Sequence, residues 1–300
     1  MKHLNLFIEL TRLNKPIGYM LLFWPCLWGL TLSYDFNNEI YIYVKYLFLF
    51  LLGSILMRSA GCIVNDIIDK KYDQKVERTK NRPVASDKVS IKLALIYVLV
   101  LCSTAFLVLI NFNLLTIVLA ISSMPFAFTY PLMKRFTYWP QLFLGITFNY
   151  GLILAWTSIN NGINIVPMIF YGGAIFWTLG YDTIYGYQDI KDDEIIGVKS
   201  TSIKFKNNTK IFLISCYSIF FISLIIIGML MNFSNFFYFT LLITFLHLFY
   251  LTLLVTFFHL FFYQIKLLNT KIPKNCLKLF KSNNFLGLVV YINILVGKFL

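Results

Sequence analysis

The sequence has little of the polar chemistry that many soluble proteins depend on. Only 13% of its 300 residues are charged, whereas 59% are hydrophobic. The three histidines lie far apart in the chain, which argues against a histidine metal centre. The five cysteines are scattered, odd in number and never arranged as C-x-x-C, so neither a disulfide framework nor a cysteine zinc site is expected. A soluble globular domain does not have this composition.

What is present instead is a series of apolar stretches, each near the length that crosses a bilayer. They predict an all-α, polytopic membrane protein with a single domain over residues 1–300, in which residues 1–15 form an interfacial N-terminal helix and not a signal peptide. About nine transmembrane helices are expected, at roughly 17–34, 44–66, 92–110, 113–130, 140–158, 164–184, 209–231, 235–262 and 284–300.

The positive charges indicate how these helices are oriented in the membrane. With the N-terminus placed in the cytoplasm, 23 of the 26 Lys and Arg residues fall in cytoplasmic segments. The remaining three are Lys45, Arg58 and Lys298. Cytoplasmic loops carry an excess of positive charge, so the asymmetry predicts this orientation.

One acidic stretch follows the second predicted span. If the helix continues through it at about 100° per residue, Asn65, Asp66, Asp69 and Asp73 lie within an arc of about 100°. Carboxylates held that close repel one another and call for a cation. Hard divalent cations such as Mg²⁺ prefer carboxylate oxygen and are often completed by substrate phosphate and water.

A second acidic stretch follows the sixth predicted span. Taken as helical, Asp182, Asp189 and Asp193 lie within about 40° of one another. Ten of the 13 acidic residues fall in segments 66–87 and 182–194, both on the predicted cytoplasmic side. Two such clusters at helix ends are interpreted as the two halves of one metal site.

Arg58 is unusual because it lies inside the second predicted span, two helical turns before Asn65. A charge at that depth is costly and usually faces a cavity or a partner. Two interpretations stay open: a buried ion pair with an Asp of the cluster, or a contact to a substrate carboxylate.

Four sequence motifs together resemble the UbiA family of intramembrane aromatic prenyltransferases. N-D-x-x-D-x-x-x-D begins at Asn65 and is followed by R-T-x-N-R-P from Arg78, and a long second motif runs from Tyr181 to Thr201. The segments Arg12–Gly29 and Thr129–Gln141 are similar to the 4-hydroxybenzoate polyprenyltransferase branch. The resemblance covers nearly the whole chain and is weakest beyond residue 210.

The resemblance implies a helical bundle around a central pocket open to lipid, with Mg²⁺ as cofactor. It implies transfer of a polyprenyl group from polyprenyl diphosphate to the ring of 4-hydroxybenzoate, ortho to the hydroxyl, in ubiquinone biosynthesis. The partners are therefore these two substrates and the lipid bilayer, with no nucleic acid. The membrane is a bacterial inner membrane or a mitochondrial inner membrane.

The metal motifs carry over to Asn65, Asp69 and Asp73 and to Asp189 and Asp193, the four aspartates being the catalytic set. Asp66 and Asp182 match further acidic positions of the branch, Asp66 beside the metal and Asp182 beside the substrate. Cations beside such a site suit a diphosphate. The expected substrate-binding residues are Arg58, Arg78, Arg82, Tyr130, Lys134, Arg135, Asp182 and Lys199.

Two groups of alternatives remain at this point. In the first, the chain is another member of the same superfamily, whose acceptor is homogentisate, dihydroxynaphthoate, haem or a chlorin. A cation-coupled transporter also places acids inside a membrane, near mid-membrane and in broken helices. Here the acids sit at helix ends on one side, which favours the prenyltransferase.

Overall fold

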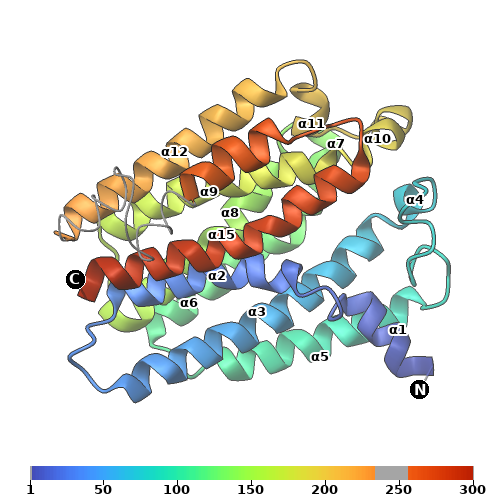
Figure 1. The fold of residues 1–300 in the computed structure, drawn as a ribbon. Helices are drawn as coiled ribbons and strands as arrows, with labels where there is room; N and C mark the ends of the chain where they lie inside the picture. Colours follow the sequence, from blue (N-terminus) through green and yellow to red (C-terminus); the bar gives the residue numbers. More distant parts are fainter. Residues whose placement is uncertain (1, 234–255, 300) are drawn as a thin grey trace.

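The computed structural model describes residues 2–233 and 256–299, which are helical and contain no β-strand. Long helices run side by side and form the body of the molecule (Figure 1). They are α2 (Ile17–Ser33), α3 (Ile40–Ile68), α5 (Ile91–Leu109), α6 (Leu114–Thr129), α8 (Pro140–Asn160), α9 (Ile165–Gly186), α12 (Thr209–Leu230) and α15 (Pro273–Phe299).

The predicted all-α membrane fold is confirmed. Six helical stretches in the described part of the chain are long and apolar enough to cross a membrane, and α2 is a shorter apolar helix. Eight of the nine predicted spans fall on described helices, although α15 begins at Pro273 and not at 284. Residues 235–255 of the span predicted at 235–262 lie outside the described residues, and its end belongs to a π-helix, η2 (Phe258–Lys266). The number nine therefore stays a prediction.

Helix α2 lies at the centre of the bundle and packs against α3, α8 and α15. Gly29 allows the closest approach, because a Cβ there would lie 2.3 Å from the carbonyl oxygen of Leu152 on α8. The ring of Trp28 packs at a tilt against that of Trp177 on α9, with ring centroids 5.0 Å apart. Its indole N–H donates to the carbonyl of Gly287 on α15 at 3.0 Å. The middle of the bundle is thus held by backbone proximity and buried indoles.

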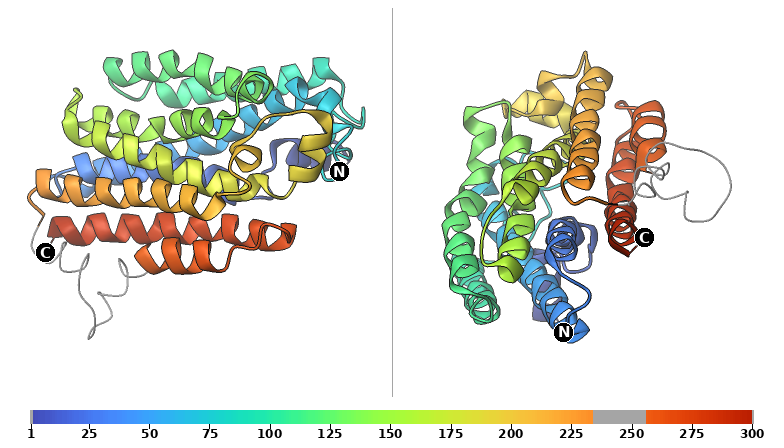
Figure 2. Two further views of the ribbon diagram at one scale, coloured as in Figure 1. Left: turned by 90° about the horizontal axis from the view of Figure 1, so that it is seen from above. Right: turned by 90° about the vertical axis from the view of Figure 1, so that its left-hand side faces the viewer.

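Short helices collect at one end of this bundle. They are α1 (Lys2–Thr11), α4 (Lys70–Asp73), α7 (Met133–Phe136), α10 (Ile190–Ile196) and α11 (Thr201–Lys204), with the 3-10 turn η1 (Tyr130–Leu132) leading into α7. The last residues of α15 lie at the opposite end of the bundle, as Figure 1 and the left view of Figure 2 show. The membrane helices therefore bring both acidic stretches to the same end of the molecule.

Candidate active site

The first acidic cluster is carried by the end of α3 and by α4. The helix breaks at Asp69, where φ is −94° and ψ is 4°, so the predicted continuous helix is interrupted. The turns nevertheless persist, since the amide of Asp69 donates to the carbonyl of Asn65 at 2.9 Å and the amide of Asp73 to that of Asp69 at 2.8 Å. Asp66, Asp69 and Asp73 are 2%, 2% and 6% exposed. The predicted common acidic face is therefore present and buried.

Arginines from two other segments neutralise this face. Arg12 Nη2 lies 2.5 Å from Asp66 Oδ1. Arg82 Nη1 lies 3.2 Å from the same oxygen and 2.7 Å from Asp73 Oδ2. Buried carboxylates of this kind require cationic partners, because an uncompensated charge in the interior is strongly destabilising. The two arginines thus tie the N-terminal segment and the loop after α4 to the end of α3.

Asp69 faces a third cationic segment, α7. Lys134 Nζ lies 2.5 Å from Asp69 Oδ2, and Arg135 donates to the carbonyl of Ile68 at 2.7 Å. Asp69 Oδ1 is buried and has no hydrogen-bond partner within the described residues, although Arg135 Nη2 lies 3.9 Å from it. Burial raises the pKa of Asp69, while the ammonium of Lys134 opposes that shift. One carboxylate oxygen is therefore in close contact with a cation, and the other has only a distant cation and no hydrogen bond.

The second acidic cluster lies between α9 and α10 and meets the first through Arg78. Arg78 Nε donates to Asp189 Oδ1 at 2.7 Å, and its Nη1 donates to the hydroxyl of Tyr185 at 3.3 Å. The neighbouring amide of Glu77 donates to Asp192 Oδ2 at 3.2 Å. Since Arg78 belongs to the loop that follows the first cluster, the predicted meeting of two distant acidic segments is observed.

The pKa of Asp193, in the second cluster, is strongly perturbed. Burial raises the pKa of Asp193 to about 7, and the negative charge of Asp189 acts in the same direction, while Lys134 and Arg78 lower it. A carboxyl group in this state loses its proton readily when a cation approaches.

Polar groups without partners lie deeper in the bundle. Arg58 Nε and Tyr181 Oη are both buried and make no hydrogen bond to any described residue. The guanidinium of Arg58 lies 5.3 Å from the ring centroid of Phe148, and no ion pair to Arg58 is found within residues 2–233 and 256–299. The alternative of a buried ion pair to an Asp is therefore not observed in that part of the chain. Buried groups left without partners call for an explanation such as a bound ligand.

Tyr130 and Asp182 lie near these groups. Asp182 interacts electrostatically with Arg58, and so does Tyr130, which comes from the turn that leads into α7. Gly18 on α2 makes room for the arginine, because a Cβ at that position would lie 2.9 Å from Arg58 Nε. A cation, a carboxyl group and phenol rings therefore converge beneath the acidic clusters.

The structure also places one predicted site residue, Lys199, and one residue outside the predicted set, Arg12. The side chain of Lys199 points to the carbonyl of Phe136 at 3.2 Å, and only its backbone amide reaches Lys134, at 2.9 Å from the carbonyl oxygen. Lys199 thus supports the α7 segment from the edge of the site. Arg12 was not among the predicted site residues, although it opens the R-L-N-K-P segment. No helical periodicity connects it to Asp66, 54 positions later.

The donor set fits a hard divalent cation. No three acidic, histidine or cysteine side chains within the described residues are close enough together to form a ready-made metal site. Asp66, Asp69 and Asp73 each face a Lys or Arg instead. Asp69 Oδ1 is nevertheless buried without a hydrogen bond in the described residues, and the set consists of oxygen donors, which Mg²⁺ and similar ions prefer.

The model of the UbiA prenyltransferase family matches residues 22–289. A relative in Drosophila pseudoobscura, named 4-hydroxybenzoate polyprenyltransferase, mitochondrial, is 38% identical over 295 residues, which cover 98% of this chain and 70% of that protein.

Solved structures share the fold at low sequence identity. A UbiA homolog from Aeropyrum pernix K1 has a TM-score of 0.72 at 20% identity, covering 93% of this chain and 98% of that one. A UbiA homolog from Archaeoglobus fulgidus bound to GPP and Mg²⁺ has a TM-score of 0.68 at 14% identity, covering 97% and 98%. With both acidic motifs side by side at the end of such a bundle, this chain belongs to the UbiA prenyltransferase family.

Proposed function

We propose that the protein transfers a polyprenyl group from polyprenyl diphosphate to the ring of 4-hydroxybenzoate, ortho to the hydroxyl, in ubiquinone biosynthesis. The observation that carries this proposal is the ion pair of Arg78 with Asp189, which joins the two acidic clusters above the unpartnered guanidinium of Arg58. The activity named for the relative that matches 98% of this chain supports the same reaction.

Mg²⁺ is the proposed cofactor, held by oxygens of both clusters. The assigned residues are Asn65, Asp66, Asp69, Asp73, Asp189 and Asp193. When bound, the ion supplies Lewis-acid stabilisation of the negative charge on the departing diphosphate. Support comes from the buried Asp69 Oδ1, which makes no hydrogen bond within the described residues, and from the metal and GPP named for the Archaeoglobus structure.

The cations around the clusters are assigned to the diphosphate. Arg78, Arg82 and Lys134 each hold a carboxylate in this structure, and phosphate oxygens suit the same donors. Arg135 and Lys199 add positive charge at the rim. As the allylic C–O bond breaks, its electron pair goes to the diphosphate, and these cations stabilise that charge.

Arg58 is assigned to the carboxylate of the acceptor, with Tyr130 and Asp182 beside the ring. The allylic carbon forms a new bond to the ring carbon ortho to the hydroxyl. A base then takes the proton from that ring carbon. A closed, aromatic pocket keeps the allylic cation from water. The buried position of Arg58 below the acids supports this order of donor above and acceptor below.

The protein is an integral membrane protein. We propose that one domain covers residues 1–300, with an interfacial helix at residues 1–15, where α1 (Lys2–Thr11) packs against α3. We place it in a bacterial or mitochondrial inner membrane with the acidic clusters facing the cytoplasm or its mitochondrial equivalent. The excess of Lys and Arg at that end supports the orientation.

The test is product analysis with purified protein in detergent. Incubation with 4-hydroxybenzoate, mixed prenyl diphosphates and Mg²⁺ should give a prenylated phenolic acid whose mass reports donor length and acceptor together. EDTA should abolish the product and added Mg²⁺ should restore it. Product formation that is indifferent to chelation would remove the metal assignment, and prenylation of homogentisate alone would replace the acceptor.

A further inference from the structure

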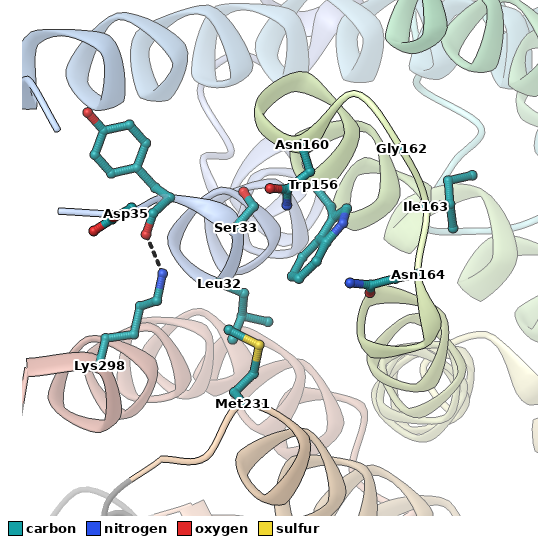
Figure 3. A pocket seen from close by; sticks show the side chains of 11 residues that line it. Leu32, Ser33, Asp35, Trp156, Asn160, Gly162, Ile163, Asn164, Met231 and Lys298 are labelled. Atoms are coloured by element: carbon teal, nitrogen blue, oxygen red, sulfur yellow. Dashed lines mark hydrogen bonds between the residues drawn. The ribbon is translucent and has the colours of Figure 1, made fainter. Parts of the chain in front are cut away.

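A second polar site lies at the end of the bundle far from the acidic clusters. An open pocket of about 580 Å³ is lined by the ends of α2, α8 and α15, the loop between α8 and α9, and the residue after α12. Figure 3 shows Trp156, Asn160 and Asn164 on one side and Asp35 and Lys298 on the other. The proposed reaction does not use any of these residues.

Lys298 supplies a positive charge to this pocket without an ionic partner. Its ammonium donates to the carbonyl of Tyr34, which uses one of its three donors. It makes no ion pair within the described part of the chain, although Asp35 lies near enough to act on its charge. A partly buried cation at this end of the membrane helices is costly unless an anion accompanies it.

Trp156 supplies a second donor. It is 4% exposed, and its indole N–H makes no hydrogen bond within the described residues, as is also true of Trp139, whereas the indoles of Trp24, Trp28 and Trp177 do donate. Asn164 adds an amide, which Figure 3 draws with its nitrogen on the side of Trp156. Tryptophan is also the side chain most suited to the boundary between lipid and water.

Asp35 adds a negative charge to the pocket. One of its oxygens accepts from the amide and side chain of Asn37 at 3.0 Å, which leaves the other oxygen for a ligand. The donors at Lys298 and Trp156 suit a phosphate, and Asp35 suits an ammonium group. A ligand that carries a phosphate and an ammonium group a few atoms apart would bind both the donors and the carboxylate.

The surroundings indicate that this ligand is a lipid. Below the pocket, α9 and α12 pack against each other and expose large apolar side chains that acyl chains could cover. These are Ile163 (47%), Ile165 (61%), Met168 (44%), Met229 (60%) and Leu230 (44%). A lipid headgroup in this pocket would bring its acyl chains against these side chains, whereas a soluble ion would contact only the polar groups of the pocket.

We infer that the pocket binds the headgroup of a zwitterionic aminophospholipid in the leaflet opposite the acidic clusters. The phosphate lies between Lys298 and Trp156, and the ammonium lies against Asp35. The volume exceeds what a phosphate alone would fill, which agrees with a headgroup that extends beyond it. The lipid would bind this end of the bundle while the reaction takes place at the other.

The test is native mass spectrometry of the full protein with bound lipid. Protein equilibrated with equal amounts of phosphatidylethanolamine and phosphatidylglycerol should retain the ethanolamine lipid preferentially. Lys298→Met and Trp156→Phe should each weaken its retention about tenfold, the size expected for one hydrogen bond to a charged group. Lys45→Met, which removes an exposed cation near the ring of Tyr46 outside the pocket, should leave retention unchanged.

Asp35→Asn should reduce the preference for ethanolamine over glycerol without abolishing lipid binding. A wild-type Tm in detergent reports that each variant is folded, so failure here is separate from failure of the proposed reaction. Equal retention by wild type and Lys298→Met would overturn the assignment. Displacement of the lipid by millimolar inorganic phosphate would show a soluble-anion site instead and would also overturn it.

Discussion

The two acidic clusters differ in how their charge is held. In the first, Asp66, Asp69 and Asp73 are almost fully buried, and each meets a Lys or Arg from a different segment of the chain. In the second, Asp189 has one cationic partner among the described residues, Arg78, and that partner comes from the loop beside the first cluster. The first cluster is therefore part of the fold, whereas the second is attached to it. Equal roles in the reaction would not imply equal roles in stability.

The strongest test of equal chemical roles is to neutralise one acid in each cluster. Asp69→Asn and Asp189→Asn should each lower kcat by about 10²–10³, the range found when one preorganised electrostatic contact to a transition state is lost. Rates of prenyl transfer in purified membranes measure this. Asp87→Asn is the matched control, because the side chain of Asp87 is 71% exposed and its one ion pair in the described part of the chain is with Lys70. A near-normal rate for either variant would remove that acid from the site.

Unequal roles in stability can be tested on acids of the same two clusters. Asp66→Ala leaves the partly buried Arg12 without its carboxylate and should cost about 3 kcal/mol, the lower end for breaking a buried pair. Asp192→Ala removes only an acceptor for a backbone amide near the surface and should cost less than about 0.5 kcal/mol. Thermal unfolding of metal-free protein in detergent measures both. Equal shifts in Tm would contradict the difference between the clusters.

The sequence predicts the acidic halves of the site well, because helical periodicity and the positive-inside bias are local or additive signals. Asn65, Asp69 and Asp73 stay on one face although α3 ends at Ile68, since the backbone hydrogen bonds continue across the break. The two clusters meet because α3 and α9 both end at the same side, which the charge count already implied. The type of each element and the end of the bundle at which the acidic stretches lie were therefore predictable from the sequence, whereas the residues at which the helices end were not.

Partners across the bundle could not be predicted in the same way. The pairs Arg12 with Asp66 and Arg78 with Asp189 join positions 54 and 111 residues apart, and no periodicity relates them. Arg58 shows the same limit from the other side. Its depth in a membrane span marked it as special, yet only the packed structure reveals that no carboxylate pairs with it in the described residues.

The attachment of the second cluster can be weakened at Arg78. Arg78→Met should raise KM for the prenyl diphosphate about 10-fold to 100-fold, because one charged, two-point contact is worth roughly 1.5–3 kcal/mol. Hydrogen exchange in α10 should rise at the same time, since Asp189 loses its only ion pair in the described chain. Lys80→Met is the control, because the one ion pair that Lys80 makes within the described residues is with exposed Glu77. A higher KM with unchanged exchange would mean that Arg78 binds substrate without holding the cluster.

The smallest expected effect separates the donor end of the site from the acceptor end. Arg58→Met should raise KM for 4-hydroxybenzoate about tenfold and leave KM for the prenyl diphosphate unchanged, because its guanidinium lies below both clusters with a free Nε. Comparison with 4-hydroxybenzamide sharpens the result. This acceptor has no carboxylate, so wild type and Arg58→Met should use it equally well. A penalty that persists with the amide would mean that the guanidinium supports the pocket wall, where it packs over Phe148. A rise in the diphosphate KM instead would assign Arg58 to the leaving group and join it to the cations of the clusters above.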